Sequence, residues 1–207
     1  MTIQKNSNIR QTTDVIAFFD FDGTITTKDS LADFIQYAVG KAAYYMGLLL
    51  KSPVLAAYKL KFIPNHIAKE KLFSYFFKGW EVNEFQKIAD KYSVEQIDKI
   101  TRPKAMERIR WHKQQDHTVV IVTASMDCWL KEWCVKHNLD LIATRFEVRD
   151  GKITGKFATK NCYSAEKVKR IRDSYCLGDY SRIYAYGDSR GDKEMLTLAD
   201  EKFYRFF

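Results

Sequence analysis

Cysteine is scarce in this sequence, and the few that occur follow no motif. The four cysteines form no C-x-x-C pair and have no close histidine partner. We interpret them as reduced core or surface thiols of an intracellular, cytoplasmic protein. The first fourteen residues are polar, so we see no signal peptide in them. An internal repeat and a low-complexity linker are also missing.

Long apolar runs are missing as well. Residues 42–63 are rich in apolar side chains, but Lys51 and Pro53 interrupt them, so they do not supply the roughly 20 unbroken apolar residues of a membrane-spanning helix. Between residues 41 and 71 the chain has six lysines and one acidic residue, Glu70. Segments of this kind lie on anionic membrane surfaces in some proteins. The alternative is that the apolar faces pack on each other and on the core.

Positive charge is in excess. The 207 residues include 34 Lys and Arg against 26 Asp and Glu, which gives a formal net charge of +8. This excess favours anionic partners such as phosphate esters, nucleic acid or an acidic membrane face. The basic residues are spread over many predicted helices and form no recognisable nucleic-acid motif, so we expect no nucleic-acid partner.

Strand and helix patterns alternate along most of the chain. Residues 15–21 predict a short buried strand, whereas residues 29–100 predict only helices. Later elements are predicted as helix 104–115, strand 118–123, helix 126–137, a hairpin over 141–157, helix 165–176 capped by Ser164, strand 182–187, helix 191–199 and strand 202–207. This order predicts an α/β fold with a doubly wound, mostly parallel sheet. Residues 1–27 and 103–207 would form the core, and 28–102 an all-helical cap inserted after the first strand.

Two aspartates follow the first strand in the stretch FFDFDGTIT, residues 18–26. Because strand side chains alternate, Asp20 and Asp22 are predicted to point to the same side at the carboxyl end of the strand. Open α/β sheets bind their ligands at that edge. Gly23 lets the backbone turn sharply as it leaves the strand.

The strand at 182–187 ends in the same way, in GDSRGD, which contains Asp188 and Asp192. If the two strands are neighbours, four carboxylates converge, and each raises the pKa of the others. A divalent cation with oxygen ligands, most simply Mg²⁺, resolves this repulsion. The sequence therefore predicts a magnesium site made by Asp20, Asp22, Asp188 and Asp192.

A hydroxyl and a lysine accompany the carboxylates. Thr123 ends the strand at 118–123, Ser125 follows it, and Lys167 lies in the first turn of the helix at 165–176. The helix dipole favours anions at that position, so a bound phosphate would account for the lysine. A metal, a hydroxyl and a lysine at strand ends indicate phosphoryl transfer. The alternatives are a solvated basic helix face for Lys167 and a helix cap for Ser125.

The segments DFDGTIT, VVIVTAS, EKVKRI and YGDSRGD, in this order and spacing, resemble the four motifs of the haloacid dehalogenase-like hydrolase superfamily. The all-helical insertion between the first two motifs resembles subclass IB, the phosphoserine phosphatase-like branch. The resemblance implies a Rossmann-like core with a helical cap. It also implies a Mg²⁺-dependent phosphomonoester phosphatase that forms a phosphoaspartate intermediate.

The resemblance also assigns roles to residues. Asp20 is implied as the nucleophile, and Asp22 as the acid and then the base, with its main-chain carbonyl on the metal. Thr123 is implied to bind a phosphoryl oxygen, and Lys167 to neutralise charge. Asp188 would bind Mg²⁺ directly, with Asp192 supporting it or acting through water. Gly23, Ser125 and Asp29 are the candidate substrate-binding residues.

The substrate is open at this point. In phosphoserine phosphatases the cap side offers an acidic group and an arginine, and Asp29 lies near the place of the former or caps the first cap helix. No arginine occurs between Arg10 and Arg102, so the carboxylate clamp that phosphoserine needs is missing. A phosphorylated small molecule, or a lipid phosphate if the cap touches a membrane, is expected. Phosphoserine phosphatase proper and a phosphotransferase or mutase of the same superfamily are the alternatives.

Overall fold

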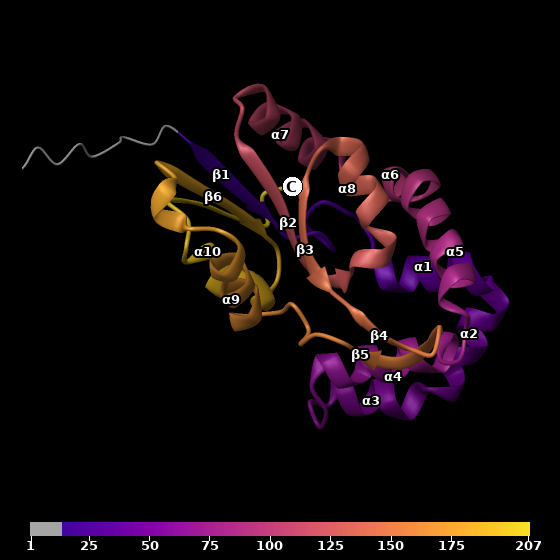
Figure 1. Cartoon of the computed structure of the whole chain (residues 1–207). Coiled ribbons are helices and arrows are strands. Elements are labelled where there is room, and N and C mark those ends of the chain that lie inside the picture. Colours follow the sequence, from indigo (N-terminus) through magenta and orange to yellow (C-terminus); the bar gives the residue numbers. More distant parts are fainter. Residues whose placement is uncertain (1–13) are drawn as a thin grey trace, which may run out of the picture.

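A five-stranded parallel sheet lies at the centre of the computed structural model, which describes residues 14–207 (Figure 1). The polar segment in which no signal peptide was expected lies almost entirely outside the described residues. The strand order is β3-β2-β1-β6-β7, and every neighbouring pair is parallel. Its strands are β1 (Val15–Phe19), β2 (Thr118–Met126), β3 (Asp140–Thr144), β6 (Arg182–Gly187) and β7 (Glu201–Tyr204). The predicted doubly wound α/β fold is confirmed.

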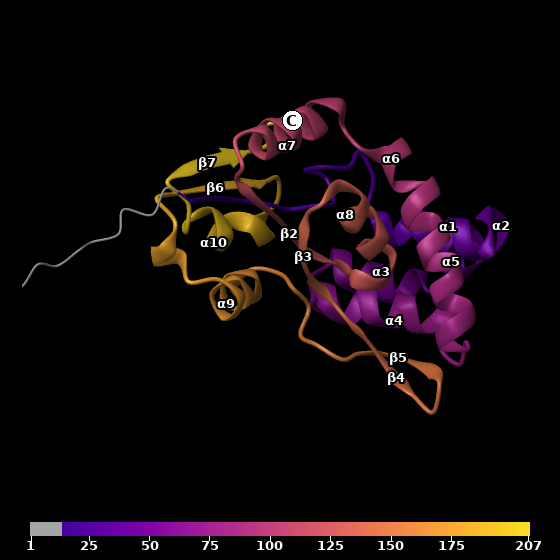
Figure 2. The same cartoon turned by 45° about the horizontal axis from the view of Figure 1, so that its top comes forward.

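Helices cover both faces of the sheet (Figures 1 and 2). They are α7 (Pro103–Gln114) and α8 (Lys131–His137) on one face, and α9 (Ala165–Ser174) and α10 (Lys193–Leu196) on the other. Ala17 and Phe19 of β1 pack into the core of the first face, whereas Ile16 and Phe18 pack into that of the second. Burial on both faces explains why β1 is a continuous apolar run.

Six helices fill the chain between β1 and α7, and no strand interrupts them. They are α1 (Ser30–Val39), α2 (Lys41–Leu50), α3 (Ser52–Lys59), α4 (Asn65–Phe77), α5 (Val82–Glu95) and α6 (Ile97–Ile100). Aromatic side chains hold them together: the ring of Phe34 packs on Phe85 at 5.5 Å and on Tyr92 at 5.2 Å. Phe34 also stacks on Trp129 from the core at 4.7 Å. This stacking fixes α1 over the carboxyl end of β2.

The hairpin differs from its prediction. Residues 140–144 pair with β2 in the main sheet as β3, and only β4 (Phe146–Arg149) and β5 (Lys152–Phe157) form the two-stranded hairpin. Asp150 and Gly151 both have positive φ at its turn, as an Asp-Gly two-residue turn requires.

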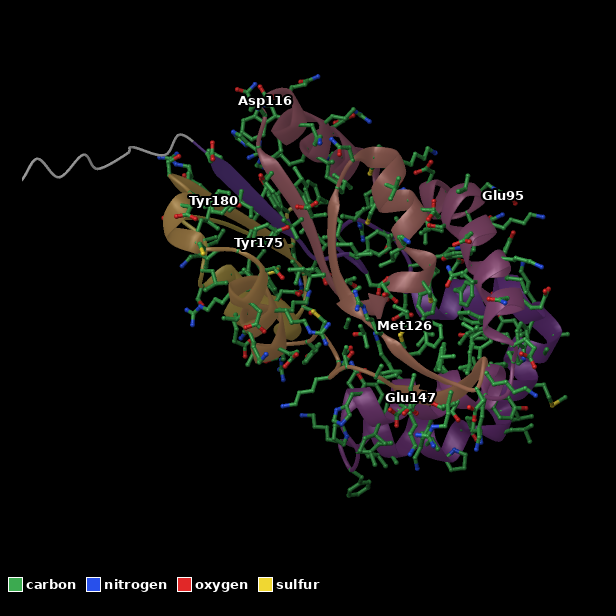
Figure 3. All side chains as sticks on the ribbon, in the orientation of Figure 1. Glu95, Asp116, Met126, Glu147, Tyr175 and Tyr180 are labelled. Atoms are coloured by element: carbon green, nitrogen blue, oxygen red, sulfur yellow. The ribbon has the colours of Figure 1, made fainter. Side chains whose placement is uncertain are left out.

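This hairpin packs on the cap helices rather than on the main sheet. The Gly79 N–H donates to the carbonyl of Ile153 at 2.8 Å, and the Ile153 N–H donates to the carbonyl of Trp80 at 3.0 Å. Figure 3 shows Glu147, on β4, beside the helices of residues 30–100 and far from Tyr175 and Tyr180. We propose that the cap consists of residues 28–102 together with this hairpin, although the hairpin lies within the segment expected to be core.

Two local predictions differ from the structure. The helix expected from Met126 begins at Lys131, because β2 continues to Met126 and Asp127–Trp129 forms the short 3₁₀ turn η1. Ser164 is the N-cap residue of α9, as predicted, but its side chain makes no capping hydrogen bond; its hydroxyl donates to a carboxylate oxygen of Glu194 at 2.6 Å.

The predictions about the cysteines and about a membrane-spanning helix can be compared with the structure. Cys128, Cys134 and Cys162 are buried free thiols and Cys176 is an exposed one, as expected for core or surface cysteines. Within residues 14–207, no helix is both long and apolar enough to cross a bilayer.

Candidate active site

The carboxyl ends of β1 and β6 bring two acidic segments together. Phe19 pairs with Tyr186 in the sheet, and the Asp20 N–H continues the ladder by donating to the Tyr186 carbonyl at 2.9 Å. Asp188 follows the last residue of β6. The two neighbouring strands therefore deliver Asp20 and Asp188 to one edge of the sheet, where open α/β sheets bind ligands.

Three carboxylates meet at this edge around one buried ammonium. Oxygens of Asp20, Asp188 and Asp192 all lie within 4.8 Å of one another. Lys167 Nζ lies 2.5 Å from Asp20 Oδ1 and 2.7 Å from Asp192 Oδ1, and it donates a third bond to the Val122 carbonyl at 2.6 Å. Three negative charges and one positive charge leave a formal charge of minus two. A divalent cation with oxygen ligands fits this balance.

The hydrogen bonds of the acidic residues distinguish their roles. Asp192 uses both oxygens: Oδ1 accepts from Lys167, and Oδ2 accepts from the N–H and the hydroxyl of Ser189 at 2.9 and 2.8 Å. Among the described residues, the carboxylate of Asp188 accepts only a long bond from the Thr24 hydroxyl at 3.4 Å, whereas its main-chain carbonyl accepts from Arg205 Nε at 3.0 Å; Asp188 is half-buried. The carboxylate of Asp188 thus keeps lone pairs that are free to bind a cation. Both oxygens of Asp192 are already used to hold Lys167 and Ser189 in position.

The electrostatics of the buried groups agree with this division. Burial raises the pKa of Asp20 to about 7, against the opposing charge of Lys167. Burial and the charge of Asp192 likewise raise the pKa of Asp188. Burial alone would raise the pKa of Asp192 too, but the Lys167 ammonium and the Ser189 hydrogen bonds hold it below its usual value. Asp20 therefore needs further positive charge nearby to be fully ionised at neutral pH.

Asp22 does not join the three carboxylates. Its Oδ1 accepts from the Ser30 N–H at 2.8 Å, and its Oδ2 accepts from the Ser125 hydroxyl at 2.5 Å. Ser30 Oγ lies 2.8 Å from Ser125 Oγ and accepts from the Trp129 indole N–H at 3.4 Å. The expectation that four carboxylates converge is thus corrected to three among the described residues. The alternation fails because β1 ends at Phe19 and the chain then turns.

This separate position changes the chemistry available to Asp22. Burial, and then the nearby charge of Asp29, raise the pKa of Asp22. A carboxyl group with a raised pKa retains a proton more readily and so is suited to donating it. Ser125 lies in β2 beside this carboxyl group, so the alternative that it caps a helix is wrong.

The remaining candidate residues occupy different places. Thr123 is buried on β2, and its hydroxyl oxygen accepts from the Ser125 N–H at 3.0 Å. Asp29 caps α1 by accepting from the Ala32 N–H at 3.0 Å, and it is exposed. Thr24, Ser30 and Ser189 contact the acidic residues but were not singled out in the sequence. Thr24 and Ser189 lie inside the quoted motifs, so their positions were the available signal; Ser30 had none.

Gly23 is required by the geometry of the acidic edge. Its φ is +88°, and a Cβ built there would lie 2.5 Å from Asp188 Oδ2. We expect Gly23→Ala to displace Asp188, to lower the free energy of unfolding by about 1 kcal/mol and to lower kcat/KM about 100-fold. Urea unfolding and steady-state kinetics measure the two effects.

Gly40 supplies the matched control. Its φ is +83°, but a Cβ there meets nothing within 4 Å. Gly40→Ala should therefore lower stability by a similar amount and leave kcat/KM within about twofold of the parent, because backbone strain alone does not move the carboxylates. Equal activity losses in the two variants would contradict the role of the space beside Gly23.

Comparison with known proteins identifies a family and similar proteins. The family model of the haloacid dehalogenase-like hydrolases matches residues 17–197. Protein CicA of Caulobacter vibrioides is 35% identical over 195 residues, which cover 93% of this chain and 86% of the relative. A Mycobacterium tuberculosis protein named "probable phosphatase" is 29% identical, covering 87% of this chain and 64% of the relative.

Solved structures show the same fold. A phosphoserine phosphatase, solved as an analogue of its phospho-aspartyl intermediate, superposes with a TM-score of 0.65 at 19% identity, over 92% of this chain and 85% of that one. The matching family model, the similar relatives and the shared fold agree. The chain belongs to the haloacid dehalogenase-like hydrolase family, and its fold is similar to that of a phosphoserine phosphatase.

Proposed function

We propose that this hydrolase is a Mg²⁺-dependent phosphomonoesterase that works through a phosphoaspartate on Asp20. The observation that carries the proposal is the buried cluster of Asp20, Asp188, Asp192 and Lys167 at the carboxyl edge of the sheet. The cluster combines a carboxylate nucleophile with a fixed ammonium and a donor set of the kind that Mg²⁺ prefers.

Asp20 and Asp188 would hold the metal through carboxylate oxygens, and the main-chain carbonyl of Asp22 would be a further ligand. Bound Mg²⁺ would neutralise negative charge that develops on the phosphoryl oxygens. Asp192 helps to keep Lys167 in place, because its carboxylate accepts a hydrogen bond from the buried Lys167 ammonium at 2.7 Å. Thr123, which is buried on β2 three residues before the strand ends at Met126, would donate its hydroxyl to a phosphoryl oxygen.

The reaction would have two displacements at phosphorus. A carboxylate oxygen of Asp20 attacks the phosphorus, the ester P–O bond breaks, and the carboxyl group of Asp22 gives its proton to the leaving alcohol oxygen. Water then attacks the phosphorus of the phosphoaspartate, and the Asp22 carboxylate accepts the proton of the water. This step releases inorganic phosphate and restores the Asp20 carboxylate.

The substrate proposed is a phosphorylated small molecule or a lipid phosphate. No arginine from α1–α6 reaches the site, since these helices contain none, and this argues against phosphoserine. An amphiphilic substrate is favoured instead by the helices around the site, which expose apolar side chains.

The test is phosphate release from a panel of phosphorylated metabolites and lipid phosphates, with Mg²⁺ and with EDTA. We expect hydrolysis that Mg²⁺ restores after EDTA treatment. In ¹⁸O-labelled water, a phosphatase places one ¹⁸O in each phosphate released. A phosphotransferase or mutase would instead place phosphate on an acceptor without the label, and that outcome would contradict hydrolysis.

We also propose that the cap contacts anionic membranes through one surface, named here the apolar cap surface. It consists of exposed side chains on and beside α2–α4: Tyr45, Met46, Leu49, Leu50, Tyr58, Leu60, Phe62 and Tyr75. Six lysines lie between residues 41 and 71 of the same segment. Apolar side chains among lysines are the chemistry that binds anionic bilayers.

Vesicle co-sedimentation tests this contact. We expect binding to phosphatidylglycerol vesicles at low salt, weaker binding to phosphatidylcholine, and at least about 10-fold weaker binding for Phe62→Glu. Val135→Glu is the matched control, because Val135 is also exposed but lies on α8. Absence of binding at low salt, or equal losses in both variants, would refute the membrane contact.

A further inference from the structure

A groove of about 260 Å³ opens among the first four cap helices. Helix α2 contacts both α1 and α3, and α3 contacts α4. Residues of all four helices line the groove. The wall is mainly apolar, with Tyr44, Leu48, Leu55, Tyr58 and Leu72 among its lining residues. Neither the nucleophile nor the acidic cluster lies in this wall, so the groove is distinct from the phosphate site.

The groove borders the active site on the side of Asp22. Asp29 lines the groove, and the next residue, Ser30, donates its N–H to Asp22 Oδ1 at 2.8 Å. Lys69 also lines the groove. Its positive charge lowers the pKa of Asp22, against the larger raising effects of burial and of Asp29. Because Asp22 protonates the leaving oxygen in the proposed reaction, the alcohol part of the ester would extend from the active site into this space.

Lys69 places a positive charge in the otherwise mainly apolar wall of the groove. It is half-buried, and within residues 14–207 no carboxylate lies within ion-pair distance of its ammonium. Its charge is therefore available to an anionic group in the groove. The apolar wall formed by Leu55 and Tyr58 offers nothing to an anion. A phosphate ester whose phosphate lies at the acidic edge and whose apolar chain lies along this wall fits the arrangement.

We propose, on the basis of the proposed phosphatase function, that this groove binds the apolar part of the leaving alcohol, so that the substrates are phosphate monoesters of alcohols with an alkyl or similar apolar chain. The groove is slightly smaller than the roughly 300–1,000 Å³ of sites that enclose a drug-sized ligand. It therefore holds a segment of several methylenes. Tyr58, which is 39% exposed, belongs to both the groove and the apolar cap surface, where a longer chain would continue.

A homologous series of n-alkyl phosphates tests the proposal below the concentration at which they form micelles. Each buried methylene contributes about fourfold in binding. We expect kcat/KM to rise at least about 30-fold from ethyl to hexyl phosphate, which allows for incomplete burial of the four added methylenes. Calorimetry with ethyl- and hexylphosphonate in the presence of Mg²⁺ should show a similar ratio of Kd values.

Two variants connect this series to the groove. Leu55→Gln should lower the hexyl-to-ethyl ratio at least about 10-fold, because it places an amide in the apolar wall. Val94→Gln is the matched control and should leave the ratio unchanged, since Val94 is 52% exposed on α5 and lines neither the groove nor the apolar cap surface.

The outcomes separate the two proposals. Hydrolysis that requires Asp20 but does not depend on chain length overturns the groove inference and leaves the phosphatase proposal standing. If no ester is hydrolysed in an Asp20-dependent way, the phosphatase proposal fails. Phosphonate binding then still decides the groove: a Kd that falls with chain length and depends on Leu55 supports it, and a flat series refutes it.

Discussion

Asp20→Asn abolishes hydrolysis, with kcat lowered at least about 10⁴-fold, while the protein remains folded. An amide is a poor nucleophile toward phosphorus, so no phosphoaspartate forms. The fold survives because the substitution removes a carboxylate whose burial is unfavourable, as its pKa of about 7 shows. Lys167 keeps its second partner, Asp192, at 2.7 Å.

Phosphate release and circular dichroism measure the two effects. Asp173→Asn is the matched control, since Asp173 is exposed on α9 and, among residues 14–207, forms an ion pair only with Lys169. It should leave kcat unchanged. A folded Asp20→Asn protein with more than about 1% of the parent kcat would show that Asp20 is not the nucleophile.

Lys167→Met gives the second large effect, on stability as well as activity. Lys167 is 1% exposed and bridges Asp20 and Asp192, so methionine leaves two buried carboxylates without their counter-charge. Breaking a buried ion pair on one side costs about 3–5 kcal/mol. We expect a loss of about 3 kcal/mol in the free energy of unfolding in EDTA at pH 7.5, and a loss of activity of at least about 10³-fold.

The pH dependence identifies the cause of that loss. Removing Lys167 raises the folded-state pKa values of Asp20 and Asp192, so the folded variant binds more protons than the unfolded chain. The variant is thus most destabilised above its folded pKa values, and the deficit shrinks as the pH falls through them toward 5. Urea unfolding at pH 5, 6 and 7.5 measures this trend.

Lys169→Met is the control on the same helix. Lys169 is exposed and pairs with Asp173, so its loss should change the free energy of unfolding by no more than about 0.5 kcal/mol at any of these pH values. A deficit of Lys167→Met that does not depend on pH would point to lost packing instead of uncompensated charge.

Sequence motifs predicted the acidic edge because it depends on local features. The apolar run of β1 and the strand RIYAYG both end in aspartate, and parallel pairing of these strands places Asp20 beside Asp188. Lys167 was harder to assign, since its neighbours on α9 are basic. Its burial follows from the helical period, which turns Lys167 and Ile171 toward the sheet and Lys169 toward solvent.

The rest of the site depends on contacts between distant segments. Asp22 accepts hydrogen bonds from Ser30 and Ser125 because the chain turns after β1 and α1 then approaches β2. No local sequence pattern specifies this approach. The hairpin of β4 and β5 has a clear turn signal, but its attachment to Gly79 and Trp80 is a tertiary contact. The apolar spacing from Met126 to Trp133 matches that of a helix, although the side chains are buried in different ways. Met126 is buried at the end of strand β2, whereas Trp129 is buried against Phe34 of the cap.

Rapid acid quenching during turnover of a ³²P-labelled ester tests the central claim most directly. We predict that the label is bound covalently to the protein and that hydroxylamine, which cleaves acyl phosphates, releases it. Mass spectrometry should locate the label on the peptide that contains Asp20. The label should be missing from Asp20→Asn. Turnover without any covalent label on that peptide, or with label on a different side chain, would contradict the account.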